Sequence, residues 1–141
     1  MSWVTKKCVV VPFDFSDESV KALEAAPEFV DDLKNIHVIH VLFTIIAGEP
    51  GMSFEALDNE ARRRDVHRAF RERFKGTRFA DLDFCVRFGD AGHEIASYAE
   101  QLGAEFIVMP SHGRTGLTRL LLGSVAEKVV RLAPCPVLIL K

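Results

Sequence analysis

The sequence predicts an α/β fold, a three-layer α/β/α sandwich in which a five-stranded parallel sheet lies between two layers of helices. Short apolar runs, suited to strands buried on both faces, alternate with capped or amphipathic segments suited to helices. The resulting order is β-α-β-α-β-α-β-α-β, and right-handed crossovers bring each strand back parallel to the last. We expect the strand order 3-2-1-4-5. No internal repeat, linker or low-complexity segment occurs, so residues 1–141 are expected to form a single domain.

The first strand and helix are predicted from the stretch CVVVPFDFSDES. The β-branched run over residues 8–12 is typical of a strand in a parallel sheet. Ser16 then stands in an N-cap position, and acidic residues follow it where they meet the positive end of the helix dipole. The pattern predicts a helix over residues 16–33 that is bent or broken near Pro27.

A second strand and a long helix follow. IHVIHVLF, residues 36–43, predicts a buried strand, and a glycine- and proline-bearing loop covers residues 44–53. Apolar residues at three- to four-residue spacing then predict a helix over residues 53–75. Its outer face is rich in arginine, which we interpret as a solvated face with i, i+4 ion pairs and not as a nucleic-acid surface.

The second half of the chain is expected to supply three more strands and two more helices. Apolar and polar residues alternate over residues 82–88, which is typical of a half-buried edge strand. The other predicted elements are a helix over residues 92–102 that ends at Gly103, a strand over 105–110, a helix over 123–132 and a strand over 136–140.

Composition restricts the classes of function. The chain has 48% hydrophobic and 27% charged residues and a formal net charge of −2, so bulk charge gives no reason to expect nucleic acid or a membrane as a partner. Cys8, Cys85 and Cys135 are far apart and lack CxxC spacing, so we predict no disulfide framework and no metal site. No signal peptide or membrane span is indicated, and we expect a cytoplasmic protein.

A ligand site is expected beyond the carboxyl ends of the strands, where the winding of the sheet reverses. Phe13 and Asp14 follow the first strand there, and the segment 110–113 follows the fourth. Neither a Walker A pattern nor GxGxxG occurs. The helix that opens at Gly123 and Ser124 nevertheless offers main-chain N–H groups to an anion.

Two interpretations of that helix start are open. Residues 106–126 contain no acidic side chain but do contain Arg114 and Arg119, a local charge that favours an anion. Ser124 and Glu127, however, form the capping-box pattern, which would satisfy the same N–H groups internally. Local chemistry alone favours the cap.

Other polar residues suggest weaker hypotheses. His112, beside Ser111, stands at the expected crevice, but no recognisable triad accompanies it, so we assign no catalytic residue. Whether the protein is an enzyme is left open; a slow ATP hydrolase would need its water-activating group among Asp14, Ser111 and His112. The odd spacing of His37 and His40 sends them to opposite faces of a buried strand, as satisfied core residues.

The last strand predicts self-association. It begins at Pro136, ends at Leu140 and is apolar throughout, although the expected strand order puts it at an edge of the sheet. Exposed edge backbone with apolar side chains invites pairing with another chain. We therefore expect a homodimer formed through this strand. Cys135 lies next to it, and we interpret its thiol as packed and inert.

The whole chain resembles the universal stress protein family. The similarity is carried by VVVPFDFS, HVIHVL, GDAGHEIASYAEQLGAEFIVMPSHG, GRTGLTRLLLGSVAEKVV and APCPVLIL. Members that bind ATP carry Gly, two residues, Gly, nine residues, Gly and then Ser or Thr. Gly113, Gly123 and Ser124 match this pattern here, whereas Pro110 replaces its first glycine.

The resemblance implies a homodimeric stress-response protein that binds ATP or another adenine nucleotide, either alone or together with Mg²⁺. If the family's ligand uses the N–H that Pro110 lacks, binding would be weakened, which leaves a nucleotide-independent interaction protein as the alternative. The implied binding residues are Pro12, Phe13, Asp14, Val41, Met109, Pro110, Gly113, Gly123, Ser124 and Val125.

Overall fold

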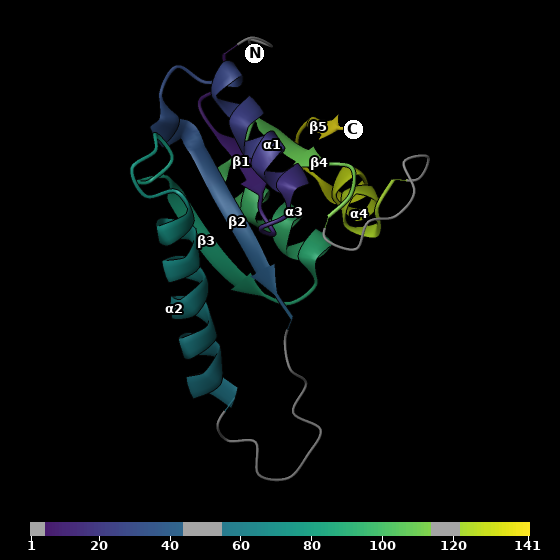
Figure 1. The fold of residues 1–141 in the computed structure, drawn as a ribbon. Helices are drawn as coiled ribbons and strands as arrows, with labels where there is room; N and C mark the ends of the chain where they lie inside the picture. The colour runs from purple at the N-terminus through teal and green to yellow at the C-terminus, as the bar shows by residue number, and fades with distance from the viewer. Residues whose placement is uncertain (1–4, 44–54, 114–121) are drawn as a thin grey trace.

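The computed structural model of the 141-residue chain describes residues 5–43, 55–113 and 122–141. Its helices and strands alternate along the chain (Figure 1). In chain order they are β1 (Val9–Pro12), α1 (Asp17–Ala25), the 3₁₀ helices η1 (Ala26–Phe29) and η2 (Leu33–Asn35), β2 (Ile36–Leu42), α2 (Glu55–Arg73), β3 (Asp83–Phe88), α3 (Ala91–Leu102), β4 (Phe106–Pro110), α4 (Ser124–Leu132) and β5 (Val137–Leu140). The strands form one parallel sheet in the order β3-β2-β1-β4-β5, which confirms the predicted fold class and strand order.

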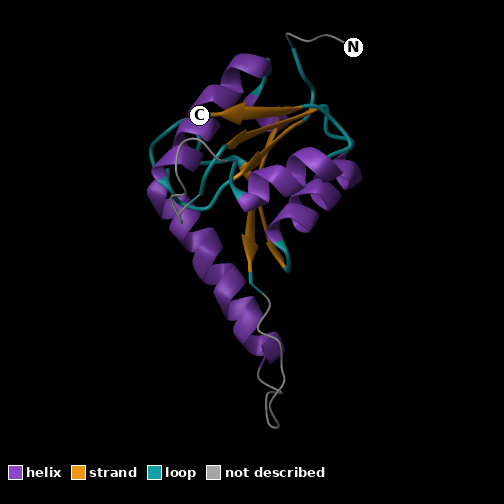
Figure 2. Ribbon diagram, turned by 90° about the vertical axis from the view of Figure 1, so that its right-hand side faces the viewer, coloured by secondary structure: helices purple, strands orange, loops and turns teal. Residues whose placement is uncertain are grey.

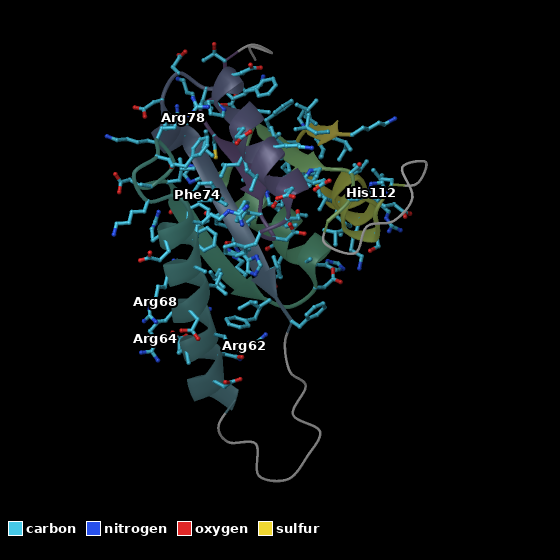
Figure 3. All side chains as sticks on the ribbon, in the orientation of Figure 1. Arg62, Arg64, Arg68, Phe74, Arg78 and His112 are labelled. Carbon is cyan, nitrogen blue, oxygen red and sulfur yellow. The ribbon has the colours of Figure 1, made fainter. Side chains whose placement is uncertain are left out.

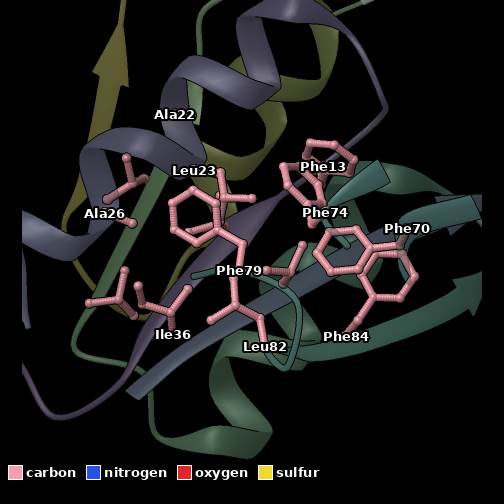
Figure 4. Close-up of a cluster of buried hydrophobic side chains, with 14 of the residues drawn as sticks. Phe13, Ala22, Leu23, Ala26, Ile36, Phe70, Phe74, Phe79, Leu82 and Phe84 are labelled. Atoms are coloured by element: carbon pink, nitrogen blue, oxygen red, sulfur yellow. The ribbon is translucent and has the colours of Figure 1, made fainter. Parts of the chain in front are cut away.

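Helices cover both faces of the sheet (Figure 2). On one face, α1 and α2 pack on the sheet through an aromatic cluster in which the rings of Phe70 and Phe84 stack with centroids 4.1 Å apart (Figure 4). On the other face, α3 and α4 pack through Ile95 and Val129. All residues of the central strands β1 and β4 are buried, as expected of strands covered on both faces.

The α2 helix lies along one face of the sheet and buries Phe70 against it, and Phe74, directly after the helix, is buried in the same cluster. Arg64 and Arg68 point away from the sheet into solvent, in agreement with a solvated basic face (Figure 3). Ion pairs on this face join residues three apart, as in Arg63 with Glu60 at 2.5 Å. Within the described ranges, no helix combines the length and apolar character needed to cross a bilayer.

The predicted helix over residues 16–33 is too long. Ser16 caps the helix as expected, since its hydroxyl accepts a hydrogen bond from the Ser19 N–H at 3.1 Å. The break near Pro27 is confirmed, because the α-helix gives way there to a 3₁₀ turn. Beyond that turn the chain is extended: the Lys6 N–H donates to the Phe29 carbonyl at 2.7 Å, and a parallel bridge joins Lys6 to Val30. This pairing with the segment before β1 replaces the last predicted helical turns.

The α3 helix is anchored at both ends, and this fixes one wall of the sheet's carboxyl edge. The Asp90 carboxylate caps its first turn by accepting from the His93 N–H at 3.0 Å. Lys128 of α4 reaches the same carboxylate with its Nζ atom, 3.2 Å from each oxygen. At the other end, Gly103 has a φ of 65° and ends the helix as predicted.

Removing this carboxylate is expected to weaken the packing of α3 on α4. Asp90→Ala should lower the free energy of unfolding by about 1 kcal/mol, the usual cost of losing an N-cap side chain, as measured by urea unfolding at pH 7. The His93 N–H and then Lys128 hold the pKa of Asp90 below its ordinary value of 3.8. The stabilisation is therefore present above the unfolded-state pKa and is lost as the pH falls through the lower, folded-state pKa. Equal stability of the two proteins at pH 7 would contradict the prediction.

Candidate functional site

A pocket of about 430 Å³ opens at the carboxyl ends of β1, β2 and β4. Pockets that hold small molecules in proteins fall in this size range and have mostly apolar walls with a few polar groups. The ten residues that the sequence suggested all line this one pocket: Pro12, Phe13, Asp14, Val41, Met109, Pro110, Gly113, Gly123, Ser124 and Val125. The segments that carry them are far apart in the chain and are brought together by the sheet. Arg114 and Arg119 lie outside the described residues.

Two prolines open the sheet at this point. The ladder between β1 and β4 covers only two pairs, Val9 with Phe106 and Val10 with Ile107. Beyond it lie Pro12 and Pro110, and neither has an N–H with which to continue the ladder. β4 instead stays paired with β5, where the Ser111 N–H donates to the Leu140 carbonyl at 2.9 Å. The missing hydrogen bonds therefore separate β1 from β4 and leave room for the pocket.

The main chain of Val41 presents one donor and one acceptor to the pocket side of β2. Residues of a parallel strand bond alternately to the two neighbouring strands. Leu42 bonds to β3, since its carbonyl accepts from the Gly89 N–H at 2.9 Å, so the N–H and C=O of Val41 face β1. Among the described residues neither group has a hydrogen-bond partner.

Asp14 lies at the mouth of the pocket and holds the turn that leads into α1. Its Oδ1 atom accepts from the Ser16 N–H at 3.0 Å and from the Ser16 hydroxyl at 2.5 Å. Asp14 therefore caps this turn. Its Oδ2 atom points toward Gly113, where a Cβ would lie only 2.5 Å away, so the close approach of these two segments requires a glycine.

The capping-box prediction for α4 is wrong. The N-cap is Gly123 and not Ser124, because the Gly123 N–H donates to the Ser111 carbonyl at 2.8 Å and places the helix start there. No side chain of the described ranges caps this helix end. The N–H groups of Ser124, Val125 and Ala126 thus have no acceptor among the described residues, and these three residues line the pocket. The positive end of a helix and its unbonded donors face this space.

A serine hydroxyl that does not cap a helix should be dispensable for its stability. We expect Ser124→Ala to change the free energy of unfolding by less than about 0.5 kcal/mol, whereas a true N-cap serine costs about 1 kcal/mol. Thermal and urea unfolding of the two proteins would measure the difference. A loss of the size expected for a cap would show that the hydroxyl satisfies the helix N–H groups in solution.

Ser111 and His112 line the pocket but do not form a hydrolytic triad. The Nδ1 atom of His112 lies 3.0 Å from the Ser111 hydroxyl, whereas Nε2 is buried without a hydrogen-bond partner. In a triad the imidazole contacts the serine with one nitrogen and a carboxylate with the other. No carboxylate among the described residues bonds to this ring, so the pair lacks the group that would orient it.

The strand histidines have the satisfied roles that the sequence suggested. The Nδ1 atom of His37 lies 2.6 Å from Asp83 Oδ2, and the Nδ1 atom of His40 lies 2.7 Å from the Phe13 carbonyl oxygen. His40 also lines the pocket, which sequence reasoning missed. The walls formed by Ala91 and Ile95 of α3 were missed as well. Their signal was the Gly89-Asp90 turn, which starts α3 at the same edge of the sheet.

Two of the three cysteines, Cys8 and Cys135, have thiols with a raised pKa. All three are free thiols and half-buried. Burial raises the pKa of Cys135 to about 11, with a further contribution from Cys8. Burial also raises the pKa of Cys8, as do Glu105 and Asp83. A thiol with a raised pKa is protonated and unreactive at neutral pH, in agreement with the packed role suggested for Cys135.

Comparisons with known proteins identify similar chains. Residues 6–141 match the family model described as the universal stress protein family. Universal stress protein MJ0531 of Methanocaldococcus jannaschii is 34% identical over 141 residues, which cover 96% of this chain and 82% of that protein. Universal stress protein MJ0577 of the same organism is 31% identical over 160 residues, covering 100% of this chain and 98% of that protein.

Solved structures show the same fold. The structure of MJ0577 superimposes with a TM-score of 0.71 at 28% identity, covering 96% of this chain and 95% of that one. A universal stress protein solved in complex with cAMP superimposes with a TM-score of 0.57 at 21% identity and covers 96% of this chain and 97% of that one.

Proposed function

The chain belongs to the universal stress protein family, and we propose that it is a stress-response protein that binds an adenine nucleotide, ATP by preference, in the pocket beyond β1, β2 and β4. The observation that carries the proposal is the α4 N-terminus. It brings three N–H groups, from Ser124, Val125 and Ala126, to a pocket whose other walls are mostly apolar, and none of the three has an acceptor in the described part of the chain. Such a helix end suits a phosphate, and apolar walls suit a base and sugar.

The base end of the proposed site is the Val41 main chain. Its N–H and C=O provide one donor and one acceptor on the same side of β2, which complements the N1 acceptor and the 6-amino donor of adenine. Ile39, Ile95 and Met109 supply apolar surface beside it. Adenine is therefore the nucleobase that we propose for this end of the pocket.

The phosphate end is bounded by Gly113, Gly123 and Asp14. Because neither glycine carries a Cβ, the phosphates can approach the main chain there. Mg²⁺ prefers oxygen ligands, and Asp14 together with the nucleotide phosphates would hold it. Bound magnesium would neutralise part of the phosphate charge.

Titration with ATP and MgCl₂ tests the proposal directly. We expect saturable heat in calorimetry and a rise in the melting temperature, because a ligand that binds only the folded state stabilises it. ADP, AMP, cAMP and GTP in parallel would rank the nucleotides, and mass spectrometry of freshly purified protein would reveal any nucleotide that co-purifies. The absence of heat, melting shift and co-purified nucleotide would refute the proposal.

Pro110 favours a second function, a dimeric interaction protein that works without a nucleotide. The residue stands where ATP-binding relatives have their first glycine, and its nitrogen has no hydrogen to donate. In this case Gly113 and Gly123 serve only to allow the close contacts with Asp14 and with Ser111. A wild-type protein that forms a stable dimer but shows neither binding heat nor a melting shift with ATP would favour this function.

We also propose a homodimer formed through β5 and a cytoplasmic location. β5 is an edge strand, and all of its residues are only half-buried in the single chain. Pairing of two such strands would cover their apolar side chains and their unpaired backbone. Free, half-buried thiols suit a reducing compartment. Sedimentation equilibrium at micromolar concentration should give twice the chain mass, and a pure monomer would exclude this dimer.

A further inference from the structure

The β1–β2 ladder stops one hydrogen bond short of Val41. Its last rung runs from the Phe13 N–H to the Ile39 carbonyl at 2.8 Å. In a regular parallel ladder the next rung would run from the Val41 N–H back to the Phe13 carbonyl. That bond is not formed, although the two residues are adjacent on neighbouring strands. A specific feature must therefore turn the Phe13 carbonyl away from β2's main chain.

The His40 side chain occupies that carbonyl. Its Nδ1 atom lies 2.7 Å from the Phe13 oxygen, and because a carbonyl oxygen only accepts, Nδ1 must carry the hydrogen. The ring is held in place by Phe15, whose ring meets it edge-on with centroids 5.3 Å apart. Phe15 has a φ of 66°, a left-handed conformation that is strained for a phenylalanine and that turns the chain out of the sheet directly after β1.

We infer that His40 is a positioning residue that keeps the Val41 N–H available to a ligand. A carbonyl can accept two hydrogen bonds, so the imidazole acts through geometry: it draws the Phe13 peptide toward the side chain and away from the Val41 main chain. Without it, β1 is expected to extend its ladder by one rung, from the Val41 N–H to the Phe13 carbonyl, and this donor would no longer be free to bind a ligand in the pocket. The consequence for adenine recognition rests on the nucleotide-binding function proposed above.

The variants follow from the geometry of the imidazole. The amide nitrogen of asparagine takes nearly the place of the histidine Nδ1, so His40→Asn should keep the bond to the Phe13 carbonyl. His40→Gln places its amide one bond farther out, and His40→Leu has no donor. Both are expected to lose the bond. Because two variants lose this bond, the test still works if one of them fails to fold.

The first measurement needs no nucleotide. Amide hydrogen exchange of Val41, followed by NMR, should be fast in the wild type and in His40→Asn. In His40→Leu and His40→Gln it should slow by about tenfold, the effect of a newly formed main-chain hydrogen bond. If Val41 exchanges at the wild-type rate in both losing variants, then the Phe15 turn alone ends the ladder and the inference is wrong.

The second measurement compares ATP with ITP, which lacks the 6-amino donor and has a hydrogen on N1. The wild type and His40→Asn should bind ATP more tightly than ITP. In His40→Leu and His40→Gln the ratio of the two affinities should fall by about tenfold, while the part of the affinity that comes from the phosphates is kept. An unchanged preference in the losing variants would overturn the inference. If the wild type binds neither nucleotide, the proposed function fails, and the exchange measurement alone decides the role of His40.

Discussion

The variant Pro110→Ala should bind ATP about ten- to a hundredfold more tightly than the wild-type protein. The substitution restores a main-chain N–H that can donate to the charged ligand, and such a hydrogen bond is worth roughly 1.5 to 3 kcal/mol. Alternation along β4 places the nitrogen of residue 110 on the side of β1, since the Ser111 N–H is used by Leu140 of β5. A restored N–H would therefore face the crevice and not the β4–β5 ladder. Calorimetric titration of both proteins with ATP and MgCl₂ measures the gain.

Pro110→Gly is the matched control for this prediction. Like the glycine of the family pattern, this variant has a main-chain N–H and lacks a Cβ. A gain in affinity shared by the alanine and glycine variants is therefore due to the N–H. A gain found only in the glycine variant is due to the space that a side chain would occupy. Equal affinity in all three proteins would contradict the prediction. So would a loss, which would show that the new N–H bonds to the Pro12 carbonyl and draws β1 and β4 together.

Replacing Gly123 by alanine is expected to abolish the ATP-induced rise in melting temperature and to destabilise the fold. The new Cβ would lie 2.8 Å from the Ser111 carbonyl oxygen, which belongs to the main chain and cannot rotate away. The Ser111 N–H holds the same residue against β5, so we expect the α4 N-terminus to move instead. Overpacking of this kind costs about 1 to 3 kcal/mol, to be measured by urea unfolding with and without ATP.

Gly113→Ala separates the loss of ligand from the loss of stability. Its Cβ would meet the Oδ2 atom of Asp14, the end of a side chain, so the collision can be relieved by a small rotation. Ser16 resists that rotation because it is bonded to Oδ1. We expect a smaller loss of stability than in Gly123→Ala, together with weaker ATP binding in the presence of Mg²⁺. A full melting shift in Gly123→Ala would show that the α4 N-terminus does not bind phosphate.

The candidate site was predictable from the sequence wherever it depends on segments that end strands. Pro12, Asp14 and Pro110 could be placed at one edge because parallel strands bring their carboxyl ends together. The part played by His40 could not be predicted, since it depends on a hydrogen bond to a residue 27 positions away. A histidine in a buried strand carries no local sign of which carbonyl it will meet.

Helix ends show the same limit. The pattern Ser-x-x-Glu predicted Ser124 as the cap of α4, but the bond from Gly123 to Ser111 moves the cap by one residue. A break near Pro27 was predicted from the chemistry of proline, but the helix was expected to continue to residue 33; the extended chain after η1 depends on pairing with Lys6. In both cases a hydrogen bond between distant segments outweighed the local preference.

The sequence by itself determined the order of strands and helices, the parallel sheet and the edge at which the site forms, because periodicity, proline and capping residues act within a few positions of the chain. Only the tertiary structure decided which main-chain groups are left unbonded there. The Val41 N–H is available because His40 engages the Phe13 carbonyl, and the Ser124 N–H is available because Gly123, which has no side chain, is the N-cap of α4. Such bonds depend on where distant segments meet, which local sequence preference does not specify.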